Sequence, residues 1–320
     1  MLKYLVILLD DTSTSYCHYE NEKKECRLIA LEDLKAGILF AMKENLMIQF
    51  VYPNYELPQE YKSLIYSVDH IKIIPLSSSE QGDILVINGV NEICKLQIEE
   101  NKTYVLRVLK NEFFNYISQI NEIMCKMVRL NIVITDIETF TEEDFDKYNN
   151  SLTQLSHEIE NLYMNGRSPQ LNLLTDRLFI SSMNNCNAGY ENITLAPDGK
   201  FYICPAFYQA DSRIVIDDKK RCIGDLQKGV DIKNPQLYQL KNAPLCRNCD
   251  AYQCKRCIWL NRKTTLEVNT PSHEQCVIAH IERNASRNLL YHVRRHGNFL
   301  SGVTIKEISY LDPFDIRTEW

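Results

Sequence analysis

Short apolar runs alternate with longer amphipathic stretches along roughly the first 180 residues of the chain. The stretches 31–45, 113–130 and 141–164 place apolar residues three and four positions apart, which predicts helices, and Thr141 followed by Asp144 predicts a helix start. Strands are predicted for the runs 4–9, 47–52, 71–75, 84–87, 104–108 and 131–135. Strands that alternate with helices predict an α/β fold built on a parallel sheet.

Beyond about residue 178 the pattern becomes irregular and rich in cysteine. Within it, the apolar runs 193–195 and 201–203 flank Pro197-Asp198-Gly199, which predicts a hairpin whose glycine supplies the positive φ. A final helix is predicted for 273–296, and an apolar tail, 300–320, is expected to dock on a partner or on its own chain. The changes in texture predict three parts, 1–182, 183–282 and 283–320.

Composition narrows the class of protein. The 320 residues are 45% apolar and 24% charged, as in ordinary globular chains, and a net charge of -6 gives no basic field for nucleic acid. The apolar run at 4–9 is too short for a membrane span or a secretory signal, so we expect a cytoplasmic protein without a membrane partner. No glycine-rich phosphate loop is present.

Twelve cysteines are the unusual feature. Two Cys-x2-Cys pairs lie within twelve residues, and in a reducing compartment such pairs are more often metal ligands than disulfides. From these pairs alone a four-cysteine zinc site and an iron–sulfur cluster are equally favoured. Seven cysteines gather in the carboxy-terminal part: Cys186, Cys204, Cys246, Cys249, Cys254, Cys257 and Cys276. By contrast, Cys94 lies in a helical pattern, where we expect a small core residue.

The order of these cysteines is specific. Twelve residues separate Cys186 from Gly199, and four separate Gly199 from Cys204. The four closely spaced cysteines from 246 to 257 and then the lone Cys276 follow. This order resembles the SPASM domain, the carboxy-terminal extension of radical SAM peptide-modifying enzymes, and the segments 193–207 and 223–226 resemble it too. Among the four cysteines from 246 to 257, the second and third spacings are each one residue shorter than is usual in that family.

The SPASM resemblance implies auxiliary [4Fe–4S] clusters and their ligands. One cluster would take Cys246, Cys249, Cys254 and Cys276, and the other would take Cys186, Cys204 and Cys257. The second set is one ligand short, because Asn192 stands where some members have a further cysteine. Either Cys222 is its fourth ligand or one iron stays open to a substrate, a small ligand or solvent. An incompletely ligated site could equally bind no cluster.

A SPASM domain implies that residues 1–182 form a radical SAM partial (β/α) barrel. The Cys-x3-Cys-x2-Cys motif that holds the SAM-binding cluster is absent, since the loop after the first strand offers only Cys17, His18 and Cys26. The segment that holds the SAM amino group is also missing, and Glu56 is its only candidate remnant. We therefore expect a degenerate barrel that binds no SAM.

The loop Ser15-Tyr16-Cys17-His18-Tyr19-Glu20-Asn21, a barrel without cluster ligands and a SPASM tail together resemble the CXXX repeat peptide maturases. This resemblance implies an auxiliary iron–sulfur component of ribosomal peptide (RiPP) maturation, a heterodimer partner of a true radical SAM maturase that acts on a Cys-rich precursor peptide. Two alternatives stay open: a maturase whose open cluster ligates a substrate thiolate, and a structural zinc-binding scaffold. The sequence assigns no catalytic residue.

Overall fold

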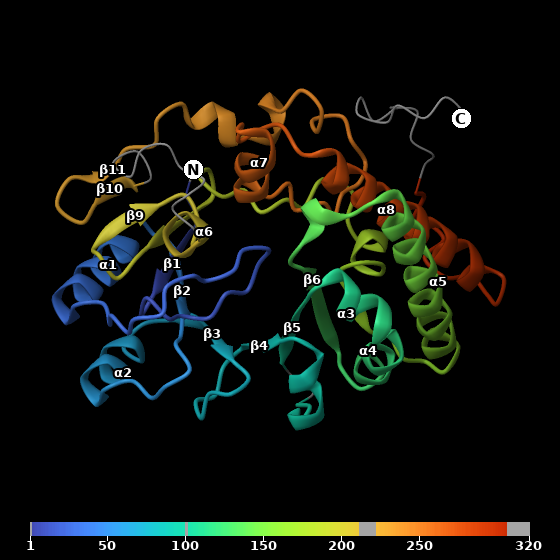
Figure 1. Ribbon diagram of the computed structural model, residues 1–320, viewed down its shortest axis with the longest axis horizontal. Coiled ribbons are helices and arrows are strands. Elements are labelled where there is room, and N and C mark those ends of the chain that lie inside the picture. The colour runs from blue at the N-terminus through green and yellow to red at the C-terminus, as the bar shows by residue number, and fades with distance from the viewer. Residues whose placement is uncertain (1, 100–101, 211–221, 306–320) are drawn as a thin grey trace. The chain divides into compact units, whose positions relative to one another are not determined.

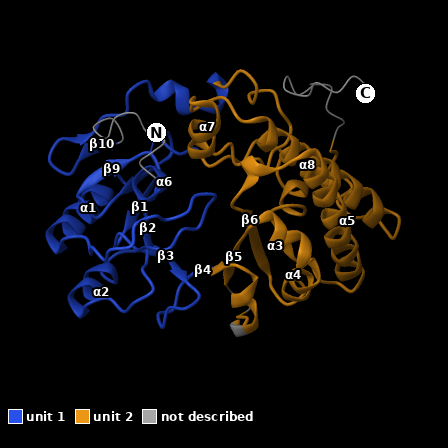
Figure 2. Cartoon of the chain, viewed as in Figure 1, with its two compact units in different colours: residues 1–86, 187–242 blue, residues 87–186, 243–320 orange. Residues whose placement is uncertain are grey.

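The computed structural model describes residues 2–99, 102–210 and 222–305 (Figure 1). The chain forms two compact units, which Figure 2 colours separately. Unit 1 comprises residues 1–86 and 187–242, and unit 2 comprises residues 87–186 and 243–320. Each unit thus combines a segment of the βα region with a segment of the cysteine-rich region. The divisions at residues 182 and 282 stay a prediction.

Unit 1 is built on a mixed sheet with the strand order β11-β10-β9-β8-β1-β2-β3-β4. The strands from β8 to β4 are parallel, and those from β8 to β11 are antiparallel. Its strands are β1 Tyr4–Leu8, β2 Met47–Val51, β3 His70–Pro75, β4 Ile84–Asn88, β8 Asn192–Leu195, β9 Lys200–Tyr202, β10 Cys222–Asp225 and β11 Gly229–Val230; the last two residues of β4 belong to unit 2. Its helices are α1 Leu31–Lys43, α2 Gln59–Ile65, α6 Ala206–Gln209, η6 Pro235–Tyr238 and η7 Leu240–Asn242.

The predicted strands of this unit are confirmed, with bounds that shift by one residue. β1 is central and fully apolar, because it is covered on both faces like the middle strand of any parallel sheet. The hairpin β8–β9 is also confirmed, and Gly199 has a φ of +74° in its turn. A side chain there would be strained and would meet Asp33, so the turn needs glycine.

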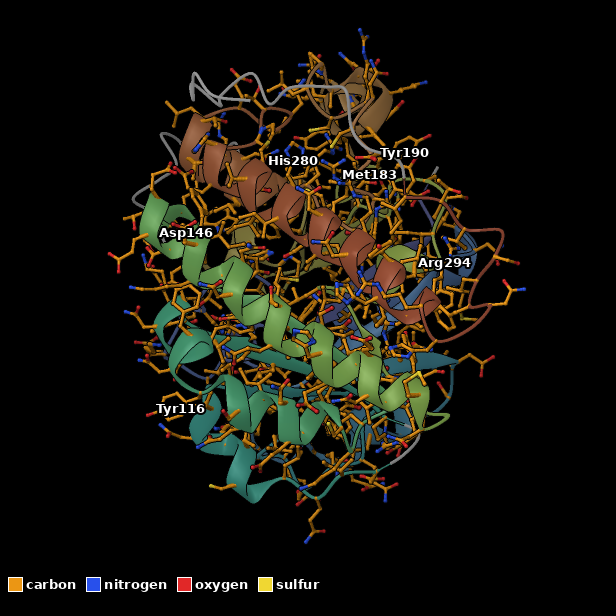
Figure 3. All side chains as sticks on the ribbon, turned by 90° about the vertical axis from the view of Figure 1, so that its right-hand side faces the viewer. Tyr116, Asp146, Met183, Tyr190, His280 and Arg294 are labelled. Atoms are coloured by element: carbon orange, nitrogen blue, oxygen red, sulfur yellow. The ribbon has the colours of Figure 1, made fainter. Side chains whose placement is uncertain are left out.

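Unit 2 contains the parallel strands β5 Thr103–Val108, β6 Arg129–Ile134 and β7 Gln170–Leu171. The predicted capping pattern is confirmed, since Thr141 and Asp144 form a reciprocal capping box at the start of α5. Figure 3 shows α8 alongside α5. Its helices are α3 Lys110–Asn115, α4 Ile117–Met124, α5 Glu142–Met164, α7 Ile258–Thr265, α8 His273–Arg294, η1 Val90–Lys95, η2 Ile137–Thr139 and η3 Asp176–Leu178.

α5 and α8 are the longest helices among the described residues, and both are amphipathic. In this part of the chain no helix is long and apolar enough to cross a membrane. The final helix was predicted for 273–296 and ends at Arg294, which confirms it closely. Of the tail 300–320, residues 306–320 lie outside the described residues.

One predicted helix is wrong in extent. Residues 113–130 do not form a single helix, because the backbone leaves the helical conformation at Tyr116 and α4 ends at Met124. Arg129 and Leu130 instead pair with Thr103 and Tyr104 in β6. Arg129 and Leu130 are thus part of the sheet, although the apolar spacing of residues 113–130 alone also fits a helix.

The α/β class predicted from the sequence is confirmed by the parallel strands and their connecting helices.

Candidate metal centre

The first predicted ligand set lies around one cavity in unit 2, and its four cysteines, Cys246, Cys249, Cys254 and Cys276, are named the quartet. Cys276 comes from the first turn of α8, and the other three come from the irregular segment before α7. Met183 and His280, which Figure 3 labels, line the same cavity. The remaining lining residues are Leu245, Ala251, Arg256, Pro271 and Ala279. Most of the wall other than the thiols is therefore apolar.

Tight turns shape the cysteine segment. The Cys249 N–H donates to the Cys246 carbonyl at 3.1 Å, and the Cys254 N–H donates to the Ala251 carbonyl at 2.8 Å. The Ala251 N–H also donates to the Cys249 Sγ at 3.4 Å. Such N–H donors stabilise sulfur in its anionic form, which is the form that binds metals.

Burial changes the acidity of two of the predicted ligands, Cys254 of the quartet and Cys257 of the second set. Although both residues keep part of their surface exposed, burial of the thiol raises the pKa of Cys254 to about 12 and that of Cys257 to about 12. A cation is therefore needed to convert these thiols to thiolates, and metal binding would release protons. The Nε2 atom of His280 lies 3.6 Å from the Cys249 Sγ.

A buried ionic network holds the cysteine segment against the rest of unit 2. The carboxylate of Asp250 lies 3.7 Å from the Arg177 guanidinium and 3.3 Å from that of Arg283. Gln253 donates to Asp176 at 2.8 Å. Sequence analysis missed these residues, because a lone Arg or Asp outside a motif carries no signal of its partner.

The second predicted set is divided between the two units. Cys186 and Cys257 belong to unit 2, where the Cys186 N–H donates to the Lys255 carbonyl at 3.0 Å. Cys204 and Cys222 belong to unit 1, where Cys222 faces Tyr202 across β9 and β10. The ligation of a cluster by this set, with or without Cys222, stays a prediction.

All twelve cysteines lie in the described residues, and none of them forms a disulfide. Among the described residues, no three Cys, His, Asp or Glu side chains converge closely enough to hold a single metal ion. The donor chemistry of the cavity nevertheless fits an iron–sulfur cluster, since four thiols and an apolar wall are what such a cluster uses. The role of the quartet as metal ligands stays a prediction.

In unit 1, the chain's own loop closes the carboxyl end of β1 and β2. The Thr14 N–H donates to the Tyr52 carbonyl at 3.0 Å, and the Ser13 hydroxyl donates to the Val51 carbonyl at 2.8 Å. The loop returns beside β1, where the Ile29 N–H donates to the Leu9 carbonyl at 2.8 Å. Ligands of parallel α/β folds usually bind at this end of the strands.

Gln209 of α6 fastens the same loop. Its Nε2 atom donates to the Asp11 carbonyl at 3.2 Å and to the Ser13 carbonyl at 2.8 Å, and its Oε1 atom accepts from the Tyr19 hydroxyl at 2.9 Å. Gln209 is 1% exposed. The Tyr19 hydroxyl and the Asp11 and Ser13 carbonyls at this strand end thus have partners within unit 1.

The residues considered for SAM binding also belong to unit 1. Cys17 is partly exposed and Cys26 is exposed. Glu56 forms an ion pair with Lys62 at 2.6 Å, and the hydrogen bond and charge of Lys62 lower the pKa of Glu56.

Cys94 corrects an expectation. It is exposed, and its thiol donates to the Asn91 carbonyl at 3.1 Å. Its helix, η1, is a short 3₁₀ segment, so an apolar neighbourhood that looks helical in sequence does not bury this residue.

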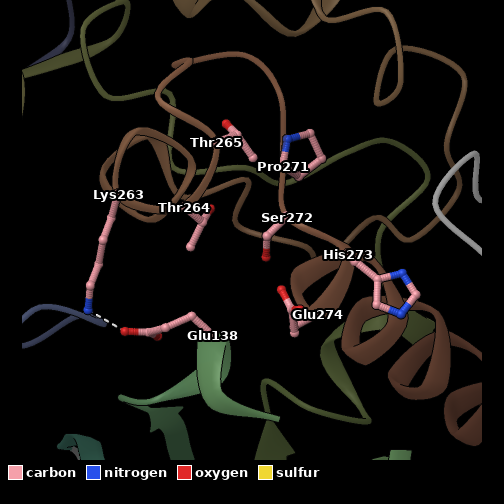
Figure 4. Close-up of a pocket in the computed structure, with 8 residues that line it drawn as sticks. All are labelled: Glu138, Lys263, Thr264, Thr265, Pro271, Ser272, His273 and Glu274. Carbon is pink, nitrogen blue, oxygen red and sulfur yellow. Dashed lines mark hydrogen bonds and ion pairs between the residues drawn. The ribbon is translucent and has the colours of Figure 1, made fainter. Parts of the chain in front are cut away.

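A second hollow of unit 2 lies between η2, the end of α7 and the start of α8 (Figure 4). Lys263 forms an ion pair with Glu138 at its edge, and Ser272 caps α8 by accepting from the Gln275 N–H at 3.3 Å. The other lining residues are Thr264, Thr265, Pro271, His273 and Glu274. No thiol lines this hollow, so the cavity of the quartet is the stronger candidate site.

Comparison with known proteins gives a clear likeness in fold. The structure of hexahistidine-tagged anSMEcpe with bound AdoMet matches with a TM-score of 0.59 and 12% identity, over 93% of this chain and 97% of that one. The structure of native anSMEcpe with bound AdoMet and Cp18Cys peptide matches with a TM-score of 0.56 and 13% identity, over 91% and 99%. At such identities the likeness concerns the fold alone, and it agrees with the predicted α/β class.

Sequence comparison adds little. No protein-family model matches the chain. A stretch of 102 residues, 32% of this chain, is 30% identical to "Protein PFC0760c" of Plasmodium falciparum (isolate 3D7), of which it spans 3%. The resemblances to the SPASM domain and to the CXXX repeat peptide maturases therefore stay predictions.

Proposed function

We propose that this protein is an auxiliary iron–sulfur component of ribosomal peptide maturation in the cytoplasm. It would act as the partner of a true radical SAM maturase on a Cys-rich precursor peptide. The single observation that carries this proposal is the gathering of Cys246, Cys249, Cys254 and Cys276 around one cavity. The proposal takes its direction from the fold, which is similar to that of proteins with bound AdoMet and bound peptide.

The quartet would hold one [4Fe–4S] cluster, which supplies one-electron transfer when it is bound. The chain's own part is to position the thiols and to exclude water from them. The turns around Ala251 and Asp250 orient the cysteine segment, and Met183, Leu245 and Ala279 shield the cavity. A second cluster would need Cys186, Cys204 and Cys257, together with Cys222 or an open iron.

We further propose that this chain binds no SAM, although its structural neighbours hold AdoMet. Two observations support this view. The loop after β1 has two cysteines, Cys17 and Cys26, where the binding of SAM to a cluster requires three closely spaced ones. At the strand end where a ligand would enter, the segment from Asp11 to Ile29 is hydrogen-bonded to the last residues of β1 and β2 and to Gln209.

Metal analysis tests the cluster. Protein purified without oxygen is assayed for iron, acid-labile sulfide and zinc. We expect roughly four or eight irons with equal sulfide per chain, corresponding to one or two clusters. One or two zinc ions without sulfide would overturn the proposal in favour of the zinc scaffold.

A second experiment separates partner from enzyme. The protein is reduced and incubated with SAM, alone and after co-expression with the suspected maturase and precursor. We expect 5′-deoxyadenosine and a modified peptide only with the maturase present. Formation of 5′-deoxyadenosine by this protein alone would instead favour a maturase in its own right.

A further inference from the structure

Arg256 places a positive charge among the cysteine thiols. It lies between Cys254 and Cys257 in sequence, it lines the cavity of the quartet, and it is 1% exposed. It is one of the largest fully buried side chains of the described residues. A buried guanidinium is costly unless an anion accompanies it.

The backbone at this position is also unusual. Arg256 has a φ of +45°, in the left-handed region that residues with a side chain rarely adopt. A glycine would relieve this strain but would remove the charge. Strain of this kind persists where the surrounding structure needs a particular side chain in a particular place.

Cysteine thiols lie around Arg256. The four cysteines of the quartet line the same cavity as Arg256, and Cys257 of the second set is its neighbour in the chain. Arg256 therefore lies beside members of both predicted ligand sets.

The charge of the guanidinium of Arg256 and the ionisation of the cysteine thiols are coupled. A protonated thiol carries no charge and does little for the buried guanidinium, whereas a metal-bound thiolate compensates its charge. A cluster with a doubly positive core and four thiolates is a net anion, and one-electron reduction makes it more negative. A nearby buried cation stabilises the reduced form more than the oxidised form.

We propose that Arg256 is the charge-compensating residue of the cluster held by the quartet and that it raises the reduction potential of this cluster. This inference rests on the proposed function, because it requires a cluster at the quartet. The residue acts on the cluster through its charge, and it is neither a ligand nor a catalytic residue. In the cell the electron would come from a low-potential protein or flavin reductant, and in the test it comes from dithionite.

The test is a redox titration of the anaerobically purified full chain with dithionite and mediators, followed by electron paramagnetic resonance. Arg256→Met keeps an unbranched side chain like the aliphatic part of arginine and removes the charge. We expect the reduction equilibrium to weaken at least tenfold, which is a negative shift of about 59 mV for one electron. Arg256→Lys should recover most of the loss.

Arg247→Met is the matched control. Arg247 lies between Cys246 and Cys249 in the same segment but is exposed, so water screens its charge and the potential should stay at the wild-type value. An unchanged potential in iron-replete Arg256→Met would overturn the inference, and so would an equal shift in Arg247→Met.

Variants that bind no cluster also test the charge-compensating role of Arg256. If Arg256→Met binds no iron, charge compensation predicts that Arg256→Lys still does, and loss of iron in both variants would overturn the inference. Iron and sulfide absent from the wild-type protein would overturn the proposed function as well. Iron content therefore judges the proposed function, and the potential judges the role of Arg256.

Discussion

The strand-end loop of unit 1 and the thiol cavity of unit 2 treat polar groups in opposite ways. In the loop, hydrogen bonds with Gln209 satisfy buried polar groups of Asp11, Ser13 and Tyr19 within the unit. In the cavity, cysteine thiols lie beside the buried guanidinium of Arg256. This arrangement favours an iron–sulfur cluster, whose iron binds thiolates and whose ligated form is a net anion.

The two regions therefore differ in whether they favour a ligand. The loop is held by hydrogen bonds within unit 1, so a ligand at that position would have to displace it. Cysteine thiols beside a buried guanidinium favour a metal cluster, because its iron would convert the thiols to thiolates and the resulting anionic cluster would compensate the guanidinium. The following changes break or sharpen this contrast.

The largest effect is expected in the cavity. Cys249→Ala removes a predicted ligand, so anaerobically purified protein should lose about four irons per chain. Unit 2 should also be destabilised, because its irregular cysteine segment relies on metal binding to offset its ordering entropy. Iron analysis and thermal unfolding measure both effects.

Cys94→Ala is the control for this change, since Cys94 is exposed and distant in sequence from the quartet. Its iron content and melting temperature should match those of the wild-type protein. Equal loss of iron in the two variants would show that the ligand assignment is incorrect.

Next comes the anchor of the cysteine segment. Asp250→Asn leaves the buried guanidinium groups of Arg177 and Arg283 without their shared carboxylate. We expect the free energy of unfolding to fall by about 3 kcal/mol. Denaturant titration measures it, and Asp146→Asn, at an exposed position of α5, should change it by less than about 0.5 kcal/mol. Equal changes in both variants would contradict an anchoring role.

A smaller, local effect is expected in unit 1. Gln209→Leu removes three hydrogen bonds at a cost of about 1.5 kcal/mol, chiefly because the buried Tyr19 hydroxyl loses this acceptor, whereas Asn21 still donates to the Asp11 and Ser13 carbonyls. Amide hydrogen exchange should quicken across residues 11–28, and trypsin should cut there sooner. Gln59→Leu, at an exposed position of the same unit, provides the comparison. Unchanged exchange in Gln209→Leu would show that this residue does not fasten the loop.

The smallest effect is expected at Asp144, which lies outside both the strand-end loop and the thiol cavity. Its substitution tests the contribution of an ordinary ion pair. Burial opposes its ionisation, but hydrogen bonds from Lys110 and Thr141 outweigh burial and lower the pKa of Asp144 below 3.8. Its folded pKa is depressed, so its contribution is full above the unfolded pKa and disappears as pH falls through the folded value. Asp144→Asn should cost about 1 kcal/mol at pH 7 and almost nothing near pH 2, as measured by urea unfolding. A constant difference across that range would contradict this account.

The sequence by itself determined the elements whose signals are local. The run Tyr4–Leu8 is apolar throughout and became a central strand, and Thr141 with Asp144 became a capping box. Pro197-Asp198-Gly199 specified a turn, because only glycine adopts its positive φ at low cost. Local spacing failed between Tyr116 and Leu130, where pairing with a distant strand decided the outcome.

The candidate site shows the same division. The spacing of the cysteines predicted that they bind metal, since paired thiols carry that chemistry wherever they fold. The SPASM resemblance already predicted that Cys276 joins the three thiols of the segment before α7, and the structure brings these four residues to one cavity. Only the tertiary structure decided that Arg256 is buried beside them. The closed loop of unit 1 was equally invisible in sequence, because Gln209 lies about 190 residues from its partners. Contacts between residues far apart in the chain depend on packing, and packing leaves no periodic trace in the sequence.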